Sequence, residues 1–415
     1  MATASIITIG DELLIGHTID TNSAWIAQHL NNLGVWVNRR TAVGDVWDDI
    51  WNALDEESRH SNIILITGGL GPTADDITKP LLCKYFGGEM VINEEALQNV
   101  KDIFNRLNRP IIERNLKQAE VPNNCKVLNN KRGTAPGMWF EKEGKIYVSM
   151  PGVPYEMKGI MLDYVLPQLP ALFKLPAVYH KTLLTAGQGE SFIAEKLKDF
   201  ELHLPSYIKL AYLPDYGMVR LRLTGKNNDK KILEKEVNEK FEQLKLLVAD
   251  FLVTDTDDPM ELVIGKILRS ANKTMCTAES CTGGSIASLI TSVAGSSDYF
   301  KGSIVSYANE VKRNLLQVSP QTLQTAGAVS EETVTQMAQG SLIQLNADYT
   351  IATSGIMGPG GGSEEKPVGM VWVAVGNKEK IITHRFQWRF DRERNISLTV
   401  QNALNMLRKF ILSHQ

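Results

Sequence analysis

The sequence predicts an α/β protein in which two three-layer α/β domains are joined by a small α+β domain. Short apolar segments of strand length alternate with amphipathic helical segments at both ends of the chain, which is typical of mostly parallel sheets covered on both faces. A proline-rich stretch at 167–176 and an acidic stretch at 255–258 interrupt this alternation. Since 415 residues exceed what one hydrophobic core usually supports, we expect domains at 1–170, 177–252 and 258–415.

Composition and charge restrict the class of protein. Hydrophobic content of 43%, charged content of 22% and a net charge of −3 are typical of a globular protein without a basic surface for nucleic acid or anionic membranes. The N-terminus has no basic region followed by a long apolar run, so we expect neither a signal peptide nor a membrane helix. Seven histidines form no metal signature, and four cysteines form no CxxC pair, which favours a reducing cytoplasm.

The first domain is expected to alternate strands and helices. The helix at 22–33 should be capped by Thr21 or Asn22, and the chain should close with a helix at 153–165. The remaining predicted elements are strands at 5–9, 36–41 and 62–67, helices at 46–59, 78–85, 94–107 and 113–119, and a hairpin of 137–140 with 145–150.

A glycine-rich loop, TGGLGPTADDIT at 67–78, follows a buried strand and precedes a helix. Its glycines let a ligand approach the backbone closely, so Thr73 and the helix N-terminus can receive a phosphate. Asp75 and Asp76 can instead bind a divalent ion that bridges phosphates, or the loop is an ordinary turn with an aspartate cap. Gly10-Asp11-Glu12 ends the first strand, and because parallel strand ends line one crevice, we expect both loops to face one ligand.

The middle domain reads as strands at 178–185, 208–213 and 218–224 with helices at 190–199 and 229–247. Lysine and arginine are frequent there, but so are aspartate and glutamate, and no GXXG clamp occurs. A spacer or dimer element is therefore favoured over a nucleic-acid-binding module.

The third domain again alternates strands and helices. Its first helix should be capped by Asp258, with Pro259 at the first helical position. The later elements are strands at 273–277, 303–307, 348–353, 368–375 and 380–386 and helices at 283–293, 310–316, 331–344 and 392–412.

AESCTGG at 278–284 predicts a strand-to-helix turn that exposes Ser280. A hydroxyl beside free backbone N–H groups, here those near Thr282 and Gly283, can attack a carbonyl while the N–H groups hold the oxyanion. A serine that only caps the helix is the alternative. Cys281 is a rival nucleophile, but no histidine lies nearby in the sequence to activate it, so we expect a small buried residue.

Three other segments could complete such a site. Lys312 lies one helical turn after Asn309 and can act as a base when neutral. The glycine-dense loop at 353–362 can cradle an anion, and Arg392 can anchor one. The alternatives are a solvated lysine, a plain turn, and an arginine paired with Asp391 or Glu393.

The motifs AESCTGG, SYANEVK, GAVSEET, TSGIMGPGGG and KPVG resemble the C-terminal domain of the CinA family, which has the nicotinamide-nucleotide amidohydrolase fold. The resemblance implies hydrolysis of nicotinamide mononucleotide to nicotinic acid mononucleotide and ammonia by a serine–lysine pair that uses no cofactor. It implies the catalytic residues Ser280, Lys312 and Tyr307. It implies the substrate-binding residues Glu279, Thr282, Gly283, Asn309, Ser354, Gly355, Gly360 and Arg392.

The motifs GDELLIG, DTNSAWIA, TGGLGPTADD and MPGVPYEM resemble the MoaB/MogA-like domain of molybdopterin-binding proteins and of the N-terminal half of CinA. The resemblance implies a pyrophosphatase that needs a divalent ion, cobalt or magnesium, and converts ADP-ribose to AMP and ribose 5-phosphate. It implies the phosphate- and nucleotide-binding residues Asn22, Gly68, Gly69, Gly71 and Thr73 and the metal ligands Asp11, Asp75 and Asp76. The middle unit resembles the KH-like domain of the same family.

Together these features predict a bifunctional hydrolase of pyridine-nucleotide salvage. We expect it to act on small nucleotides in the cytoplasm, as a homodimer, without membrane or nucleic-acid partners. Two alternatives remain: an N-terminal domain that only binds a nucleotide or pterin, and a non-catalytic factor in competence or DNA damage.

Overall fold

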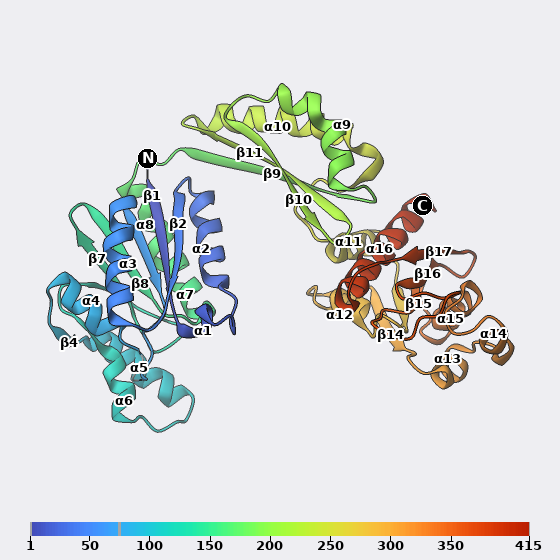
Figure 1. Ribbon diagram of the computed structural model, residues 1–415, viewed down its shortest axis with the longest axis horizontal. Helices are drawn as coiled ribbons and strands as arrows, with labels where there is room; N and C mark the ends of the chain where they lie inside the picture. The colour runs from blue at the N-terminus through green and yellow to red at the C-terminus, as the bar shows by residue number, and fades with distance from the viewer. Residues whose placement is uncertain (1, 74–75, 415) are drawn as a thin grey trace. The chain divides into compact units, whose positions relative to one another are not determined.

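The computed structural model describes residues 2–73 and 76–414 (Figure 1). Its chain divides into two compact units. The first unit runs to Tyr179 and includes Gly225–Lys235, and the second comprises His180–Thr224 and the chain from Glu236 onward. No helix in 2–73 or 76–414 combines the length and apolar character needed to cross a bilayer.

The first unit contains a six-stranded sheet in the order β2-β1-β3-β8-β7-β6. The first four strands in this order are mutually parallel, whereas β7 and β6 are added antiparallel, which confirms the predicted mostly parallel sheet. The strands are β1 Thr3–Ile9, β2 Trp36–Val43, β3 Ile63–Thr67, β6 Lys126–Leu128, β7 Gly137–Lys142 and β8 Lys145–Met150.

Helices cover both faces of this sheet because its strand residues alternate in direction. Ile6 and Leu65 pack into one apolar cluster, while Ile7 and Ile64 pack into a second cluster on the opposite face. The helices are α1 Asp11–Leu14, α2 Thr21–Asn32, α3 Trp47–His60, α4 Thr78–Phe86, α5 Glu94–Arg106, α6 Glu113–Leu116, the 3₁₀ turn Lys117–Ala119, α7 Pro154–Ile160, the π-helical turn Met161–Val165 and α8 Leu166–Leu172. A separate pair, β4 Met90–Ile92 and β5 Glu120–Pro122, was not predicted.

Two predicted boundaries of this unit are wrong. Helix α2 is capped by Asp20, whose carboxylate accepts the N–H of Ser23 at 2.9 Å, and not by Thr21 or Asn22. The closing helix does not stop at residue 165 but continues through α8 to Leu172. Pro167 lies just after the π-helical turn Met161–Val165 and does not end the helix.

The middle segment forms a four-stranded sheet in the order β10-β11-β9-β12 with two helices. The elements are β9 Ala177–Ala186, α9 Glu190–Leu202, β10 Ile208–Asp215, β11 Met218–Asn227, α10 Lys230–Leu247, the 3₁₀ turn Ala249–Phe251 and β12 Leu252–Thr254. The strand–helix–strand–strand–helix pattern is confirmed. Strand β12 was missed because its three residues are too few to show periodicity.

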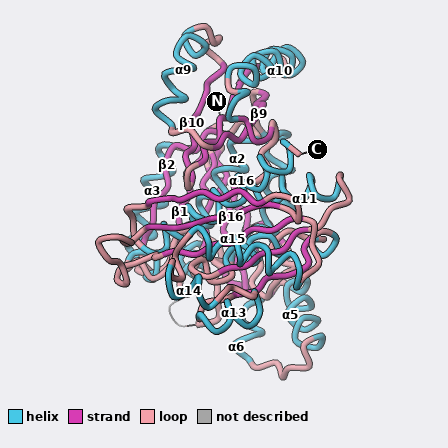
Figure 2. Tube along the Cα trace, turned by 90° about the vertical axis from the view of Figure 1, so that its right-hand side faces the viewer, coloured by secondary structure: helices cyan, strands magenta, loops and turns pink. Residues whose placement is uncertain are grey.

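The C-terminal part of the second unit has a five-stranded sheet in the order β14-β13-β15-β16-β17. The first three strands in this order are parallel and the last two are antiparallel additions. Apolar clusters lie on both faces, and helices α15 and α16 both lie against β16 (Figure 2), so the predicted three-layer α/β architecture is confirmed. The strands are β13 Met275–Glu279, β14 Phe300–Val305, β15 Tyr349–Gly355, β16 Met370–Gly376 and β17 Ile381–Gln387. The helices are α11 Met260–Ser270, α12 Ser285–Thr291, the 3₁₀ turn Ser296–Asp298, α13 Asn309–Leu316, α14 Pro320–Thr325, α15 Glu331–Gln344 and α16 Arg392–Ser413.

The predicted cap of the helix that opens this domain is wrong. Pro259 takes the cap position of α11, and no side chain caps the helix. Asp258 instead accepts a hydrogen bond from Thr256 Oγ1 at 2.7 Å and forms an ion pair with Lys266. A carboxylate can satisfy its lone pairs with a side-chain cation as well as with helix N–H groups.

Candidate functional sites

Ser280 lies in the turn between β13 and α12, as the sequence predicts. Its N–H donates to the Thr353 carbonyl oxygen at 3.0 Å, which ties the turn to β15. Gly283 and Gly284 follow with φ values of +62° and +96°, a region that L side chains disfavour. The turn therefore depends on glycine at both positions, and Ser280 is only 8% exposed.

Lys312, from α13, reaches the same point. Its Nζ lies 3.0 Å from Ser280 Oγ, 2.7 Å from the Ser306 carbonyl oxygen and 3.3 Å from the Tyr307 carbonyl oxygen. The side chain is 1% exposed, and this burial lowers the pKa of Lys312 below its ordinary value. A neutral amine has two N–H bonds, which match the two carbonyls, and one lone pair, which is left for the Ser280 hydroxyl. The alternative of a solvated helix lysine is wrong.

Glu279 was predicted to bind substrate, and its surroundings contradict this. The side chain is fully buried and accepts the N–H groups of Gly284, Ile286 and Ala287 at 3.1, 3.0 and 2.9 Å. The hydroxyl of Thr282 donates to Glu279 Oε2 at 2.8 Å as well. Since a carboxylate at a helix N-terminus satisfies otherwise unpaired N–H groups, Glu279 positions the Ser280 turn instead of contacting a ligand.

These bonds also decide which N–H groups can hold an oxyanion. Gly283 donates its N–H to the Ser280 carbonyl oxygen at 3.1 Å, so the predicted role of Gly283 as an oxyanion donor is wrong. Within the described part of the chain, no backbone acceptor or side chain receives the N–H of Thr282. The N–H of Thr282 therefore remains available next to the Ser280 hydroxyl.

Tyr307 and Arg392 meet at the rim of this site. Arg392 donates from Nη2 to Tyr307 Oη at 3.3 Å and from Nη1 to the Gly358 carbonyl oxygen at 2.8 Å. Asp391 caps α16 by accepting the N–H of Arg394, and no ion pair of the described residues joins Arg392 to Asp391 or Glu393. Tyr307 is 65% exposed, and in 2–73 and 76–414 no hydrogen bond joins its hydroxyl to Ser280 or Lys312. Tyr307 Oη is therefore free to meet a ligand on its exposed side, and its catalytic role stays a prediction.

The other predicted residues of this site separate into two groups. Ser354 is buried and donates to the Ala328 carbonyl oxygen at 2.6 Å, and Gly355 packs against the backbone of Met370, so both shape the loop from below. Asn309 and Gly360 are exposed, and a side chain added at Gly360 would meet open space. Ser354 thus donates its hydroxyl proton within the protein, and its contact with substrate stays a prediction.

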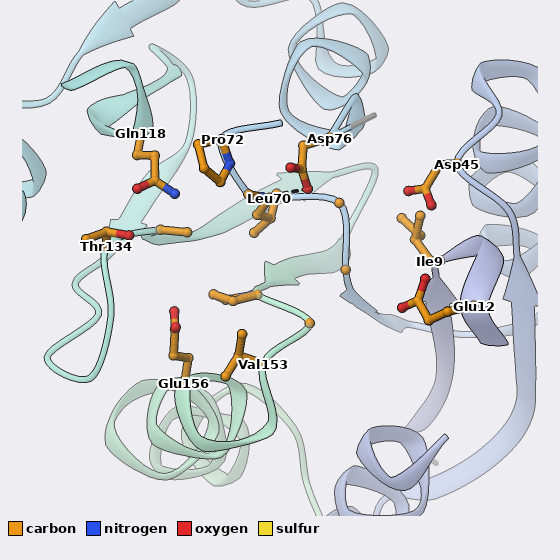
Figure 3. A pocket seen from close by; sticks show the side chains of 17 residues that line it. Ile9, Glu12, Asp45, Leu70, Pro72, Asp76, Gln118, Thr134, Val153 and Glu156 are labelled. Atoms are coloured by element: carbon orange, nitrogen blue, oxygen red, sulfur yellow. Dashed lines mark hydrogen bonds between the residues drawn. The ribbon is translucent and has the colours of Figure 1, made fainter. Parts of the chain in front are cut away.

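The second candidate site is a cavity of about 460 Å³ at the carboxyl ends of β1, β3 and β8 (Figure 3). The glycine loop forms one wall, with Gly68 at φ +120° and Gly69 at φ +63°. A Cβ at Gly68 would overlap the Ile9 carbonyl oxygen, and one at Gly69 would overlap Thr78 Oγ1. Only glycine fits these two positions, and Gly10 and Glu12 line the same cavity, so both predicted loops face it.

Thr73 does not face a ligand as predicted. Asp76 accepts the N–H of Gly71 at 2.7 Å, the N–H of Thr73 at 2.8 Å and the hydroxyl of Thr73, and so closes the loop on itself. Asn22 likewise donates from Nδ2 to the Gly152 carbonyl oxygen at 2.7 Å and lines a neighbouring cavity of about 100 Å³. The bonds of Thr73 and of Asn22 Nδ2 hold the loops in place, whereas Asn22 Oδ1 is buried and has no hydrogen-bond partner among the described residues.

The predicted metal ligands are not gathered into one site. Asp11 is exposed, and Asp11 and Asp45 exchange hydrogen bonds between each backbone N–H and the other carboxylate, at 3.1 and 3.2 Å. Asp75 lies outside the described residues. In 2–73 and 76–414, no group of three or more His, Cys, Asp or Glu side chains is arranged to hold an ion.

Two acidic residues of this cavity, Asp45 and Glu156, were not predicted from sequence. Its lining includes the carboxylates of Glu12, Asp45, Asp76 and Glu156, and no lysine, arginine or histidine is among the described residues that line it. A phosphate in the cavity therefore lacks a protein cation to offset its charge. This donor set fits a divalent ion that enters with the phosphates better than one held by the protein alone.

Three parts of this chain match known protein families. Residues 5–171 match the "Probable molybdopterin binding domain" family, 180–253 the "Damage-inducible protein CinA KH domain" and 257–411 the "CinA C-terminal domain". A CinA-like protein of Cytophaga hutchinsonii is 44% identical over 98% of this chain and 97% of its own length. A CinA-like protein of Flavobacterium psychrophilum is 43% identical over 99% of both chains.

Solved structures of the same superfamily are similar to part of the chain. A competence/damage inducible protein from Agrobacterium tumefaciens is 40% identical and covers 36% of this chain and 92% of its own, with a TM-score of 0.36. The competence damage-inducible protein A from Klebsiella pneumoniae is 34% identical and covers 38% and 97%, with a TM-score of 0.37.

The folds and sites define a protein that combines a molybdopterin-binding-type α/β domain and a KH-type domain with an α/β domain carrying a serine–lysine pair. Two of the matched domains and the relatives that align over nearly the whole chain all carry the name of one family. The chain belongs to the CinA family.

Proposed function

We propose that the C-terminal domain is an amidohydrolase that converts nicotinamide mononucleotide to nicotinic acid mononucleotide and ammonia. The observation that carries the proposal is the 3.0 Å separation of Lys312 Nζ and Ser280 Oγ in a buried setting. Burial favours the neutral amine, which can accept a proton from the serine.

The reaction follows from this geometry. Ser280 Oγ attacks the carboxamide carbon while Lys312 Nζ takes the hydroxyl proton, and the N–H of Thr282 faces the oxyanion that forms. Lys312 then gives its proton to the leaving nitrogen as the C–N bond breaks, which releases ammonia and leaves an ester on Ser280. A water molecule attacks the ester, Lys312 accepts the proton of that water, and the proton passes to Ser280 Oγ as the acid leaves.

The experiment that tests this proposal is ammonia release from nicotinamide mononucleotide by the purified full chain, with a chelator present. We expect product under these conditions, because each step above uses only side chains and backbone of the protein. Folded protein that releases no ammonia would contradict the proposal and leave the domain as a binding module.

Cys281 supplies a prediction that separates the two neighbouring nucleophiles. Burial raises the pKa of its thiol to about 12, so the thiolate is scarcely populated near neutral pH. We expect Cys281→Ala to keep the deamidase kcat within about threefold and to lower stability by about 1 kcal/mol, as small core deletions do. Ammonia release and thermal denaturation measure the two effects. A loss of activity at unchanged stability would instead assign the nucleophile to Cys281.

We also propose that the N-terminal domain hydrolyses ADP-ribose to AMP and ribose 5-phosphate with a divalent ion, magnesium or cobalt. The supporting observation is the cavity between the glycine loop and four carboxylates. The N–H groups of Gly69 and Leu70 are bonded to no acceptor in the described part of the chain and can receive a phosphate oxygen. When bound, the ion would neutralise phosphate charge and be shared with the carboxylates of Glu12 and Asp45.

Gly68→Ala tests this second activity. An added Cβ at φ +120° would overlap the Ile9 carbonyl oxygen and displace the loop, so we expect ADP-ribose hydrolysis to fall at least about 10-fold, since small displacements in a site are costly. Deamidation of nicotinamide mononucleotide should be unchanged and serves as the folding control. Loss of both activities would indicate misfolding, and full retention of ADP-ribose hydrolysis would place its site elsewhere.

We propose a cytoplasmic protein, because both substrates are intracellular nucleotides and the four cysteines are free thiols. We also propose a homodimer, which sedimentation equilibrium can test. Filter binding to single-stranded DNA at two salt concentrations tests the alternative of a DNA-directed competence factor.

A further inference from the structure

The cavity of the N-terminal domain has two chemically different sides (Figure 3). Glu12 and Asp45 lie on one side of the glycine loop, and Gln118, Thr134 and Glu156 lie on the other. The first side suits a cation with phosphates. The second side combines an amide, a hydroxyl and a carboxylate, which is a set of groups suited to an uncharged ligand with many hydroxyls.

Glu156 is held in place but keeps one oxygen free. Asn130 Nδ2 donates to Glu156 Oε2 at 2.6 Å and to the Ala135 carbonyl oxygen at 2.9 Å. In 2–73 and 76–414, no other hydrogen bond or ion pair engages the Glu156 carboxylate, so Oε1 remains to accept a bond from a ligand. A side chain at Gly133 would overlap this carboxylate, which shows how closely the loop fits around it.

The other two polar groups on this side are positioned in a similar way. Lys79, buried behind the cavity, donates from Nζ to the Gln118 carbonyl oxygen at 2.6 Å and so fixes the backbone of that residue. The amide of Gln118 and the hydroxyl of Thr134 are bonded to no side chain or backbone group among the described residues. The guanidinium of Arg132 on the same loop is paired with Asp163 at 2.9 Å and does not neutralise Glu156.

We propose that Glu156, with Gln118 and Thr134, forms a subsite for the vicinal hydroxyls of a ribose, and that Glu156 determines specificity for ribose over deoxyribose. This inference rests on the proposed binding of ADP-ribose in the same cavity. A carboxylate accepts hydrogen bonds from vicinal hydroxyls, as in dinucleotide-binding folds, and a single such bond to a charged acceptor discriminates strongly against a ligand that lacks the hydroxyl.

The test uses equilibrium binding with magnesium present, so that turnover is not required. The ligands are the α,β-methylene analogue of ADP-ribose and two forms of it that lack the 2′-hydroxyl, one on the adenosine ribose and one on the terminal ribose. We expect the wild-type protein to bind one of the two deoxy forms about 10- to 100-fold more weakly than the parent. Glu156→Ala should bind that form and the parent with similar affinity, whereas Glu113→Ala, an exposed site on α6, should discriminate as the wild type does.

Glu156→Gln provides a second variant in case the alanine variant is unstable. Its amide keeps the size and one acceptor atom, so we expect discrimination between the values for the wild type and for Glu156→Ala. Equal binding of all three ligands by the wild type, or unchanged discrimination in both Glu156 variants, would overturn the inference. Binding with discrimination but no hydrolysis of ADP-ribose would reject the pyrophosphatase proposal alone, and absence of binding by the wild type would reject both.

Discussion

Replacing Ser280 by alanine should reduce kcat for the deamidation of nicotinamide mononucleotide by at least about 10³-fold, because removal of a nucleophile eliminates the covalent route. KM should change little, since Ser280 is only 8% exposed as a residue and contributes a small surface to binding. Ammonia release measures the effect. Mass spectrometry of the wild-type protein during turnover should show an adduct of the acyl group, absent in the variant.

Two controls accompany this prediction. Ser288→Ala removes an exposed hydroxyl from the same helix, α12, and should leave kcat unchanged. Hydrolysis of ADP-ribose by Ser280→Ala should equal that of the wild type, because the second site uses none of these residues. Near wild-type deamidation by Ser280→Ala would show that another group attacks the carboxamide.

We expect Lys312 to be as important for the kcat of deamidation as Ser280. Because it must be neutral to act, a substitution that keeps the positive charge should not preserve activity. Lys312→Met removes the base and leaves the Ser306 and Tyr307 carbonyls without their donor, so kcat should fall by about 10²–10⁴-fold, the range of general-base catalysis. Lys312→Arg keeps a cation that cannot be deprotonated and should be equally inactive. A purely structural role would predict that arginine restores activity, which would contradict the mechanism.

The pH dependence follows from the direction of the pKa shift. Burial lowers the pKa of Lys312, and only the neutral amine can accept the serine proton. The kcat/KM value should therefore rise with pH as Lys312 loses its proton, and the midpoint should lie below the ordinary lysine pKa of 10.5. Lys301→Met, a change at an exposed lysine, should keep the profile of the wild type. A profile that is flat over this range would show that lysine deprotonation does not limit the reaction.

The stability of the fold should depend on pH in the same direction. The pKa of Lys312 is lower in the folded than in the unfolded protein, so the unfolded protein binds the proton more readily. The stability contributed by the neutral lysine is thus present above the unfolded-state pKa and declines as pH falls toward the folded-state pKa. Denaturant titrations of the wild type and Lys312→Met at several pH values can measure this difference.

Sequence alone was sufficient for the features that depend on local backbone preference. The alternation of strands and helices, the glycines at 68, 69, 283 and 284, and the placement of Ser280 in a strand-to-helix turn all follow from short-range patterns. These patterns are readable because burial on a strand repeats every two residues and because positive φ favours glycine.

The partners of polar groups could be decided only by the tertiary structure. Glu279 and Asp76 are directed toward nearby N–H groups rather than toward a ligand, and the sequence does not distinguish these two uses of a carboxylate. The sequence also does not show that Asp45 and Glu156 line one cavity, since they come from segments more than a hundred residues apart.

Ser280 and Lys312 show which features of the C-terminal site follow from sequence and which need the tertiary structure. From spacing alone, Lys312 could be an ordinary exposed lysine of a helix. The packing of α13 beside the Ser280 turn buries it, brings its Nζ to 3.0 Å from Ser280 Oγ, and lowers its pKa. Local sequence determined where Ser280 sits in its turn. The burial that leaves Lys312 neutral, and so able to accept a proton, exists only once distant segments pack together, because desolvation depends on the whole surrounding structure.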